Sequence, residues 1–226
     1  YITGERRDIG LLEEHQRGYF FVQRITSMIP PLILQPKPTD HVLDLCAAPG
    51  GKTTHLAALM QNRGVIIANE PFQHRIKELI FNLQRCGVMN TVVTQQFGTA
   101  LAGRSFDTIL LDAPCSNSGS FRGNTKKSHM IMQLWNQKRV KQFAQIQRQL
   151  ILHAYSLLRP KGTLVYSTCS LDPEEDEAVV DYLLENTDAV LKPIDLPFHA
   201  NNRKYCKIWP QDNDTDGFFV ANISKP

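Results

Sequence analysis

Short apolar runs alternate with segments of helical periodicity from residue 40 onward. The apolar runs predict buried strands, because a parallel strand covered on both faces loses the polar and apolar alternation of a half-exposed one. The segments between them repeat apolar residues every three or four positions, as in a helix that packs one face on a sheet. Strands are expected at residues 41–46, 64–69, 91–94, 106–112, 163–168, 189–194 and 217–224, and helices at 52–62, 72–86 and 136–158.

One more helix has a clear start signal after the fifth predicted strand. Asp172 is a favourable N-cap residue, and Pro173 suits the first helical position. Glu174 and Glu175 would give the first turn the negative charge that a helix N-terminus attracts. We therefore expect a helix that begins at Pro173.

Repeated strand–helix–strand units predict an α/β fold with right-handed crossovers. The expected sheet is doubly wound, mostly parallel and seven-stranded, with helices on both faces and an antiparallel last strand at residues 217–224. Residues 1–39 have a different pattern, with a polar stretch at 5–16 and four prolines within 29–38. We expect an N-terminal lead-in over 1–39, helical or extended and ending in a proline-stiffened linker, followed by one domain over 40–226.

The composition is that of an ordinary globular protein, with 226 residues, 42% of them hydrophobic, and a net charge of +3. No apolar run reaches the roughly 18 residues of a membrane span, and no basic-then-apolar leader opens the chain. Five widely spaced cysteines match neither a disulfide framework nor a zinc site. We therefore expect free thiols in a reducing cytoplasm (nucleus or nucleolus in a eukaryote), and no metal. Nothing in the pattern requires more than a monomer, and the mild positive charge leaves a nucleic-acid partner open.

The loop after the first predicted strand, residues 46–53 (CAAPGGKT), has two glycines directly before a helix, which lets the backbone approach a ligand closely. A phosphate-binding P-loop requires glycine where Cys46 stands, and the dinucleotide pattern also fails. A nucleoside cofactor without a phosphate chain is therefore favoured over a triphosphate. Glu70 ends the second strand 20 residues after Gly50, where a carboxylate can accept both ribose hydroxyls. S-adenosylmethionine fits these features, and a plain tight turn with a solvated glutamate is the alternative.

Two cysteines follow the ends of the fourth and fifth predicted strands. Cys115 comes three residues after Asp112, and Cys169 comes directly after the fifth strand. In a doubly wound sheet these strands are neighbours about 4.8 Å apart, so both thiols and the carboxylate should face one cleft beside the cofactor loop. Cys86 and Cys206 are expected to be packing residues.

Two thiols, a carboxylate and a methyl donor suit methylation at C5 of a pyrimidine. C5 is a poor nucleophile until a thiolate adds at C6 and makes it enamine-like. A protonated or proton-sharing Asp112 at N3 would absorb the developing charge, and a second thiol could remove the C5 proton before the first is eliminated. The two cysteines thus have two distinct tasks.

Four segments together resemble the motifs of the RNA cytosine-C5 methyltransferases, the RsmB/NOP family. The likeness runs from about residue 23 to the C-terminus, and the joint occurrence of the motifs is highly specific. The resemblance implies a Rossmann-like fold of the class I S-adenosylmethionine-dependent methyltransferases, and methylation of cytosine C5 in tRNA or rRNA. The segments are 44–53 (DLCAAPGGKT), 112–116 (DAPCS), 167–170 (STCS) and 216–221 (DGFFVA).

The resemblance also implies roles for individual residues. Cys169 would form the covalent bond to C6, and Cys115 would help to resolve that adduct. Asp112 and Lys52 would contact the target base, and residues 18–31 resemble an RNA-facing lead-in. The residues implied to hold S-adenosylmethionine are Cys46, Ala47, Ala48, Pro49, Gly50, Gly51, Lys52, Glu70, Arg75 and Asp112.

Three positions depart from the usual pattern of this family. Residues 94–98 (TQQFG) lack the aspartate that the family carries near the adenine. Asn117 stands where the family favours glycine, and Gln23-Arg24 replaces Gln-Glu in the lead-in. Because the carboxylate is missing, a catalytically weak or inactive RNA-binding or ribosome-assembly factor is the alternative function.

Basic side chains after the fourth-strand loop could follow the phosphates of an RNA. A solvated helix start is the alternative interpretation of the same charges. The target base must leave its stack to reach a thiol, so a flipped or single-stranded cytosine is expected. The basic stretch comprises Arg122, Lys126, Lys127, His129, Lys138, Arg139 and Lys141.

Overall fold

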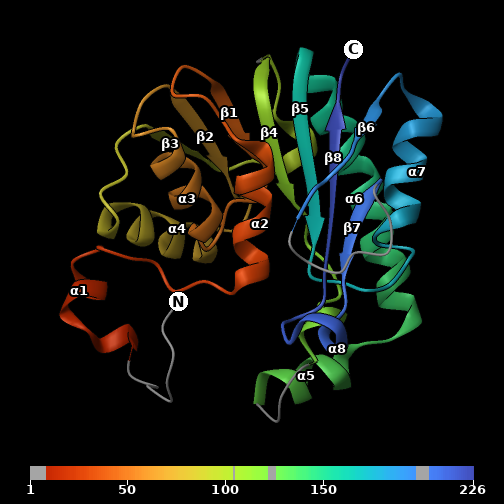
Figure 1. Ribbon diagram of the computed structural model, residues 1–226, viewed down its shortest axis with the longest axis horizontal. Helices are drawn as coiled ribbons and strands as arrows, with labels where there is room; N and C mark the ends of the chain where they lie inside the picture. The colour runs from red at the N-terminus through yellow and green to blue at the C-terminus, as the bar shows by residue number, and fades with distance from the viewer. Residues whose placement is uncertain (1–8, 104, 122–125, 197–203) are drawn as a thin grey trace.

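The computed structural model describes residues 9–103, 105–121, 126–196 and 204–226, apart from the side chains of residues 127 and 213. In this part of the chain an eight-stranded sheet has the order β3-β2-β1-β4-β5-β8-β6, and β7 pairs with β8 (Figure 1). The five strands β1 to β5 are mutually parallel, and β8 is antiparallel to its three neighbours. The strands are β1 (His41–Asp44), β2 (Val65–Asn69), β3 (Thr91–Thr94), β4 (Phe106–Asp112), β5 (Leu158–Thr168), β6 (Val190–Lys192), β7 (Tyr205–Ile208) and β8 (Phe218–Ser224).

The predicted α/β class and the doubly wound, mostly parallel sheet are confirmed, but the expected number of seven strands is wrong. The additional strand is β7, which the pattern did not reveal because it has only four residues and contains Lys207. That lysine is buried because its ammonium pairs with Asp176 at 3.1 Å and with Glu177 at 2.9 Å. Because a lysine in a short segment normally indicates an exposed position, the sequence pattern did not predict that Lys207 is buried in a strand.

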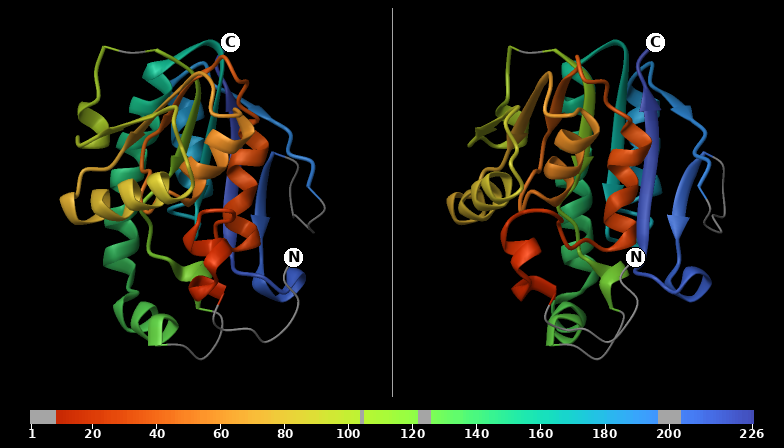
Figure 2. Two further views of the ribbon diagram at one scale, coloured as in Figure 1. Left: turned by 90° about the vertical axis from the view of Figure 1, so that its left-hand side faces the viewer. Right: turned by 60° about the vertical axis from the view of Figure 1, so that its left-hand side comes forward.

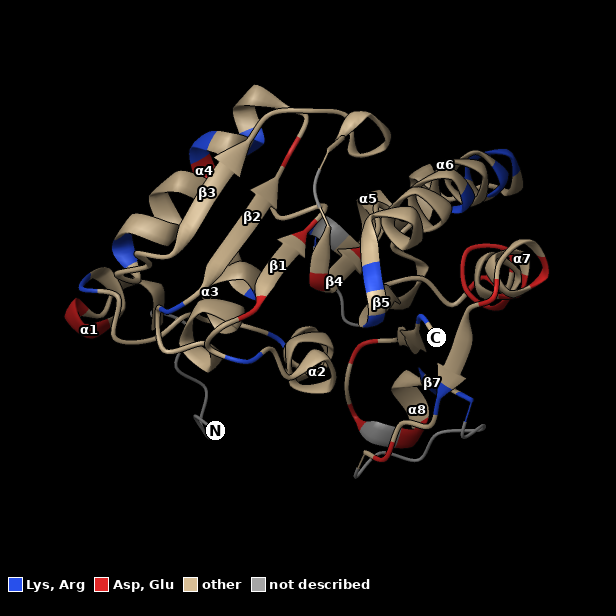
Figure 3. Ribbon diagram, turned by 90° about the horizontal axis from the view of Figure 1, so that it is seen from above, with Lys and Arg blue, Asp and Glu red and all other residues tan. Residues whose placement is uncertain are grey.

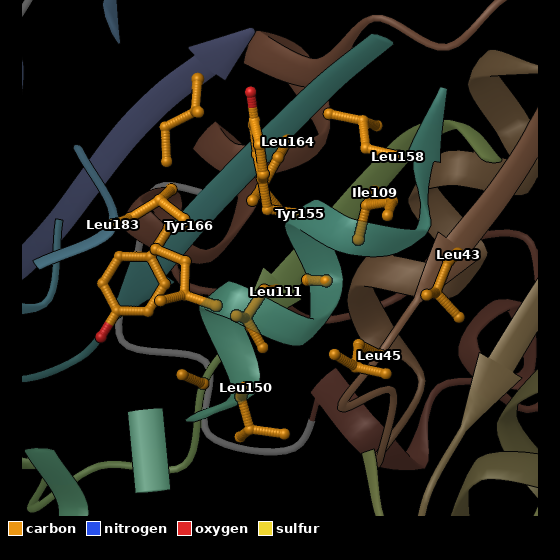
Figure 4. Packing of buried hydrophobic residues seen from close by; sticks show 14 of the residues in the cluster. Leu43, Leu45, Ile109, Leu111, Leu150, Tyr155, Leu158, Leu164, Tyr166 and Leu183 are labelled. Atoms are coloured by element: carbon orange, nitrogen blue, oxygen red, sulfur yellow. The ribbon is translucent and has the colours of Figure 1, made fainter. Parts of the chain in front are cut away.

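Helices cover both faces of the sheet (Figure 2). On one face, α6 and α7 pack on a cluster that includes Leu43, Ile109 and Leu111 (Figure 4). On the other, α2 and α3 pack on a cluster that includes Val42 and Leu110, because successive side chains of a strand point to opposite faces. The helices are α1 (Glu13–Gln16), α2 (Ile25–Leu34), α3 (Gly51–Leu59), α4 (Gln73–Arg85), α5 (Lys126–Leu134), α6 (Gln137–Leu157), α7 (Glu177–Asn186) and α8 (Pro210–Asn213), with 3-10 turns η1 (Ile9–Leu11), η2 (Gly98–Ala100) and η3 (Ser118–Ser120).

The expected proline-stiffened linker is largely a helix. Pro30 and Pro31 lie inside α2 and are buried with Ile29 and Leu34. The helix contacts α3, β4 and β5, and the burial of its apolar side chains outweighs the cost of about 3 kcal/mol that an internal proline imposes. It ends at Leu34, and its C-cap residue Gln35 has a left-handed φ of 45°. Proline content alone was thus a misleading signal for this segment.

The helix expected from Pro173 begins four residues later, at Glu177, with Asp176 in the N-cap position. Residues 172–176 form turns instead, in which Glu175 N donates to Asp172 O at 3.0 Å. The Asp172 carboxylate does not cap the helix, because hydroxyls of Ser118 in the loop after β4 and of Ser170 in its own loop donate to it. Tertiary contacts therefore override a local start signal.

The other predicted helices agree with the structure to within a few residues. The long helix α6 is capped by Asn136, whose side chain accepts a hydrogen bond from Arg139 N at 2.9 Å. The short helix α5 was not expected from the sequence. No helix among the described residues has the length and apolar character needed to cross a membrane.

We predict that Leu111→Ala lowers the free energy of unfolding by about 2–5 kcal/mol, because it leaves a cavity in the centre of the larger core cluster. Leu111 is fully buried, whereas Met89 is 80% exposed. Met89→Ala is therefore the matched control and should change the free energy of unfolding by less than about 0.5 kcal/mol. Urea unfolding of the two variants checks this, and equal losses would contradict the assignment of the core.

Candidate functional site

A cleft of about 700 Å³ opens at the carboxyl ends of β1, β2, β4 and β5. This is the edge where an open α/β sheet binds ligands, next to the point where the strand order reverses between β1 and β4. Every site residue predicted from the sequence lines the cleft except Gly50. The lining residues among those predicted are Cys46, Ala47, Ala48, Pro49, Gly51, Lys52, Glu70, Arg75, Asp112, Cys115 and Cys169.

The two glycines of the first loop are needed for different reasons. Gly50 is the N-cap of α3 and has a φ of 106°, a conformation that other residues rarely adopt. A Cβ on Gly51 would lie 2.6 Å from Gln23 Nε2 and 2.8 Å from the ring of Phe21. The lead-in therefore packs directly on the cofactor loop and forms one wall of the cleft.

Glu70 is fully buried at the end of β2. Its Oε1 accepts a hydrogen bond from Phe72 N at 3.1 Å, and its Oε2 lies 3.0 Å from Arg75 Nη1. Arg75 also donates to Ala48 O at 2.7 Å. The guanidinium thus connects the ends of the first and second strands, a role that the sequence did not reveal.

Lys52 and Asp112 form an ion pair in the floor of the cleft, with Lys52 Nζ 2.7 Å from Asp112 Oδ2. The other carboxylate oxygen accepts a hydrogen bond from Ser167 Oγ at 2.8 Å. Burial opposes the charge of Lys52, but the attraction of Asp112 outweighs it, so the pKa of Lys52 is raised. The lysine therefore remains an ammonium beside the carboxylate.

The two predicted catalytic cysteines lie together, with 3.1 Å between Cys115 Sγ and Cys169 Sγ. Cys115 is buried, and Cys169 is partly exposed to the cleft. The hydrogen bond to Cys169, together with burial, raises the pKa of Cys115 well above its usual value. Cys206 is buried in β7, as expected of a packing residue, and burial raises its pKa to about 11.

A buried carboxylate joins the two cysteine loops. Glu175 Oε2 accepts hydrogen bonds from Ser116 N and from Gln147 Nε2, both at 2.9 Å. The same Gln147 nitrogen donates to Pro114 O at 2.8 Å, and Ser170 Oγ donates to Glu175 Oε1 at 3.3 Å. Glu175 therefore holds Ser116 and Ser170, the residues that follow the two cysteines, and Gln147 holds Pro114 before Cys115.

Asp44 is a cleft residue that the sequence interpretation missed. It lies at the end of β1, is 1% exposed, and accepts a hydrogen bond from Thr53 Oγ1 at 2.7 Å. Burial raises the pKa of Asp44 to about 7. Asp44 belongs to the predicted first strand and to the first motif, and neither gives it a role, although an acidic residue among apolar strand positions is a usable signal.

The basic stretch lies partly along the cleft. Arg139 lines the cleft, and its guanidinium lies 5.4 Å from the centre of the Phe143 ring. Lys126, His129, Lys138 and Lys141 are exposed, whereas Arg122 lies outside the described residues and nothing is described of the Lys127 side chain. Figure 3 shows basic residues on α6 and acidic residues around α7. Among the described residues, no group of His, Cys, Asp or Glu is arranged to hold a metal ion.

A model of the family described as 16S rRNA methyltransferase RsmB/F matches residues 31–224. The chain belongs to this RsmB/F methyltransferase family. Membership confirms the resemblance inferred from the sequence motifs. It also agrees with the placement of the cofactor loop, the carboxylate and both cysteines of those motifs at one cleft.

Three named proteins are similar to this chain. The tRNA (cytosine(49)-C(5))-methyltransferase of Pyrococcus abyssi is 43% identical over 242 residues, which cover 100% of this chain and 76% of that protein. Ribosomal RNA small subunit methyltransferase F of Vibrio atlanticus is 40% identical over 100% of this chain and 50% of that protein. The structure of NSun6 from Pyrococcus horikoshii with SFG has a TM-score of 0.88 and 34% identity over 96% of this chain and 56% of that one. The chain therefore spans about half the length of the last two proteins.

The cofactor of this fold and family is S-adenosylmethionine, and the cleft has the acceptors that it requires. Among the described residues, the buried Asp44 Oδ1 accepts no hydrogen bond, and Glu70 Oε2 lies beside the Arg75 guanidinium but accepts no hydrogen bond of normal geometry. The ribose hydroxyls and the ammonium group of S-adenosylmethionine are donors of the kind that such oxygens lack. The donor and acceptor sets therefore fit.

We predict that Asp44→Asn changes how stability depends on pH. Folding raises the pKa of Asp44 from 3.8 to about 7, so the native protein holds a proton that the unfolded chain has already released. The wild type therefore loses stability as pH rises from about 4 to about 7, and the asparagine variant lacks this loss. The variant should gain on the order of a few kcal/mol relative to wild type across that interval. Urea unfolding at several pH values checks this, and parallel profiles would contradict it.

Proposed function

We propose that this protein methylates C5 of cytosine in a tRNA or rRNA, with S-adenosylmethionine as methyl donor. The observation that carries the proposal is the pair of sulfur atoms 3.1 Å apart in a cleft that also holds the Lys52–Asp112 ion pair. The names of the relatives support the reaction and its RNA substrates. Five free cysteines suit a reducing compartment such as the cytoplasm.

Cys169 is the nucleophile of this proposal, because it is the more exposed residue of the two. Its thiolate forms a bond to C6 of the base, and the electron pair of the C5–C6 double bond moves toward C5. Lys52 and Asp112 lie on the floor of the same cleft, where the Lys52 ammonium donates one hydrogen to Asp112 and can donate another to N3, which stabilises the charge that develops on the ring. S-adenosylmethionine, when bound, supplies the methyl group that C5 takes up.

Cys115 is the base that completes the reaction. Its pKa is raised by the hydrogen bond to Cys169, by burial and by the charge that Cys169 would carry. Once Cys169 is bonded to carbon it carries neither a proton nor a charge, so the two contributions of Cys169 disappear, the pKa of Cys115 falls and its proton is released to solvent. Cys115 then accepts the proton from C5, the C5–C6 double bond forms again, and the bond between C6 and the Cys169 sulfur breaks.

The target base must leave its stack before it can enter the cleft. Both cysteines lie in loops that follow strands, and Arg24, Phe143 and Asp216 line the same cleft. A cytosine within a duplex could not bring C6 to such a sulfur. We therefore propose that the target is flipped out or single-stranded.

The two cysteines should fail in different ways when they are replaced. Cys169→Ser should abolish methyl transfer, because a serine hydroxyl is a far weaker nucleophile toward C6 than a thiolate. Cys115→Ser should retain adduct formation and lose turnover, so that a covalent protein–RNA complex accumulates on a denaturing gel. The measurements are incorporation of labelled methyl groups into RNA and the fraction of protein bound covalently.

Cys86→Ser is the matched control, because Cys86 lies at the end of α4 outside the cleft. It should leave both readouts unchanged. Methylation by Cys169→Ser at the wild-type rate would overturn the mechanism. Bisulfite sequencing of cellular RNA with and without the gene then identifies the methylated cytosine, and an unchanged pattern would contradict the activity itself.

The cofactor site has its own test. Glu70→Gln should weaken S-adenosylmethionine binding by at least about tenfold, because the hydroxyls of the ribose would lose a charged acceptor. Glu78→Gln, at an exposed position on α4, is the control and should bind like wild type. Calorimetry without RNA measures both, and equal affinities would exclude Glu70 from the site.

A further inference from the structure

Asn117 lies between the two catalytic loops and has no role in the proposed reaction. It follows β4 and precedes the turn η3, with a left-handed φ of 63°. Asparagine is one of the few residues besides glycine that adopt this conformation readily. Its backbone is therefore compatible with the site, and its side chain is an addition that glycine would not provide.

The side-chain amide of Asn117 contacts both cysteines. Its Nδ2 donates to Cys115 O at 3.1 Å, and its Oδ1 accepts from Cys169 Sγ at 2.9 Å. These contacts fix the orientation of the amide, because only the nitrogen can donate to a carbonyl. The oxygen must therefore face Cys169, and the thiol of Cys169 is the donor.

The backbone around Asn117 is tightly held. Ser120 N donates to Asn117 O, and Gly119 N donates to Cys169 O, both at 2.9 Å. A Cβ on Gly119 would lie only 2.4 Å from Gly217 O, so this segment has little room to move. The amide is consequently a fixed acceptor for the thiol hydrogen.

We propose that Asn117 is a positioning residue in the RNA-free protein. Its amide oxygen accepts the hydrogen of the Cys169 thiol and thereby restrains that thiol. A thiol that donates to an amide oxygen is a poorer nucleophile than one without such an acceptor, because attack must first break that hydrogen bond. The incoming base therefore meets a restrained sulfur, and chemistry begins only after the contact with Asn117 is broken. The inference rests on the proposed role of Cys169 as nucleophile, but it concerns the resting state of that residue.

Alkylation of Cys169 by iodoacetamide tests the restraint without RNA or turnover. The second-order rate constant is measured on the full chain by mass spectrometry of the peptide that contains Cys169. Asn117→Gly removes the acceptor and suits the left-handed backbone, so Cys169 should react about fivefold faster, as expected for the loss of one hydrogen bond. Asn117→Asp keeps an acceptor of similar shape and gives it a charge, so Cys169 should react several-fold more slowly than in wild type.

The opposite directions of the two effects separate a positioning role from a structural one. Both variants lose the donation to Cys115 O, so a general loosening of the loop would move both rates the same way. Asn62→Gly is the matched control, because Asn62 also has a left-handed φ, 55°, and among the described residues its side chain bonds only to Gly87 O and Met89 N. Its Cys169 rate should equal that of wild type.

Equal or slower alkylation in Asn117→Gly than in wild type would overturn the proposal, and so would faster alkylation in Asn117→Asp. If the glycine variant fails to fold, the aspartate variant still decides the question, since only a restraint predicts a slower rate there. Failure of the proposed function gives a different result, namely methylation by Cys169→Ser, and leaves the alkylation rates unaffected.

Discussion

The parallel pairing of β4 with β5 is the contact on which the candidate site depends. Its register places Asp112 opposite Ser167, and the Ser167 hydroxyl donates to the Asp112 carboxylate at 2.8 Å. Both strands end there, so the loops with Cys115 and Cys169 leave the sheet side by side. A register shift of one residue would turn Asp112 away from the cleft, because successive side chains of a strand point to opposite faces. The sulfur–sulfur contact is therefore a consequence of strand pairing.

Strand pairing alone would leave two loops free to move, and a buried polar network limits that movement. Asp172 Oδ2 accepts hydrogen bonds from the hydroxyls of Ser116, Ser118 and Ser170, at 2.7 to 3.1 Å. The Glu175 carboxylate joins the same loops, and burial raises the pKa of that carboxylate. Polar groups that are buried together in this way are stable only when each finds a partner, which favours one arrangement of the loops over others.

The lead-in completes the cleft from a distant part of the sequence. Phe21 and Gln23 lie against Gly51, and Arg24 forms an ion pair with Asp216 in the turn before β8. Residues near both ends of the chain thus meet over the cofactor loop. A ligand in the cleft would be enclosed by segments that the central sheet does not itself supply.

Much of this arrangement could be predicted from local sequence. The periodicity of apolar residues identified most of the sheet, four of the helices that cover it and the strand ends at which Asp112, Cys115 and Cys169 lie, because burial on one or two faces leaves a pattern within a few residues. The glycines of the cofactor loop and Glu70 were found for the same reason, since turn geometry and strand ends are local features.

Other features were decided only by the tertiary structure. Pro30 and Pro31 lie in a helix because its buried face contacts the sheet, and Asp172 binds hydroxyls rather than capping a helix because the fourth-strand loop approaches it. Lys207 is buried in β7 because Asp176 and Glu177 pair with it, and the contact of Asn117 with Cys169 spans 52 residues of the chain. Local propensity differences amount to about 1 kcal/mol per residue, so contacts between distant segments determine the outcome wherever the two disagree.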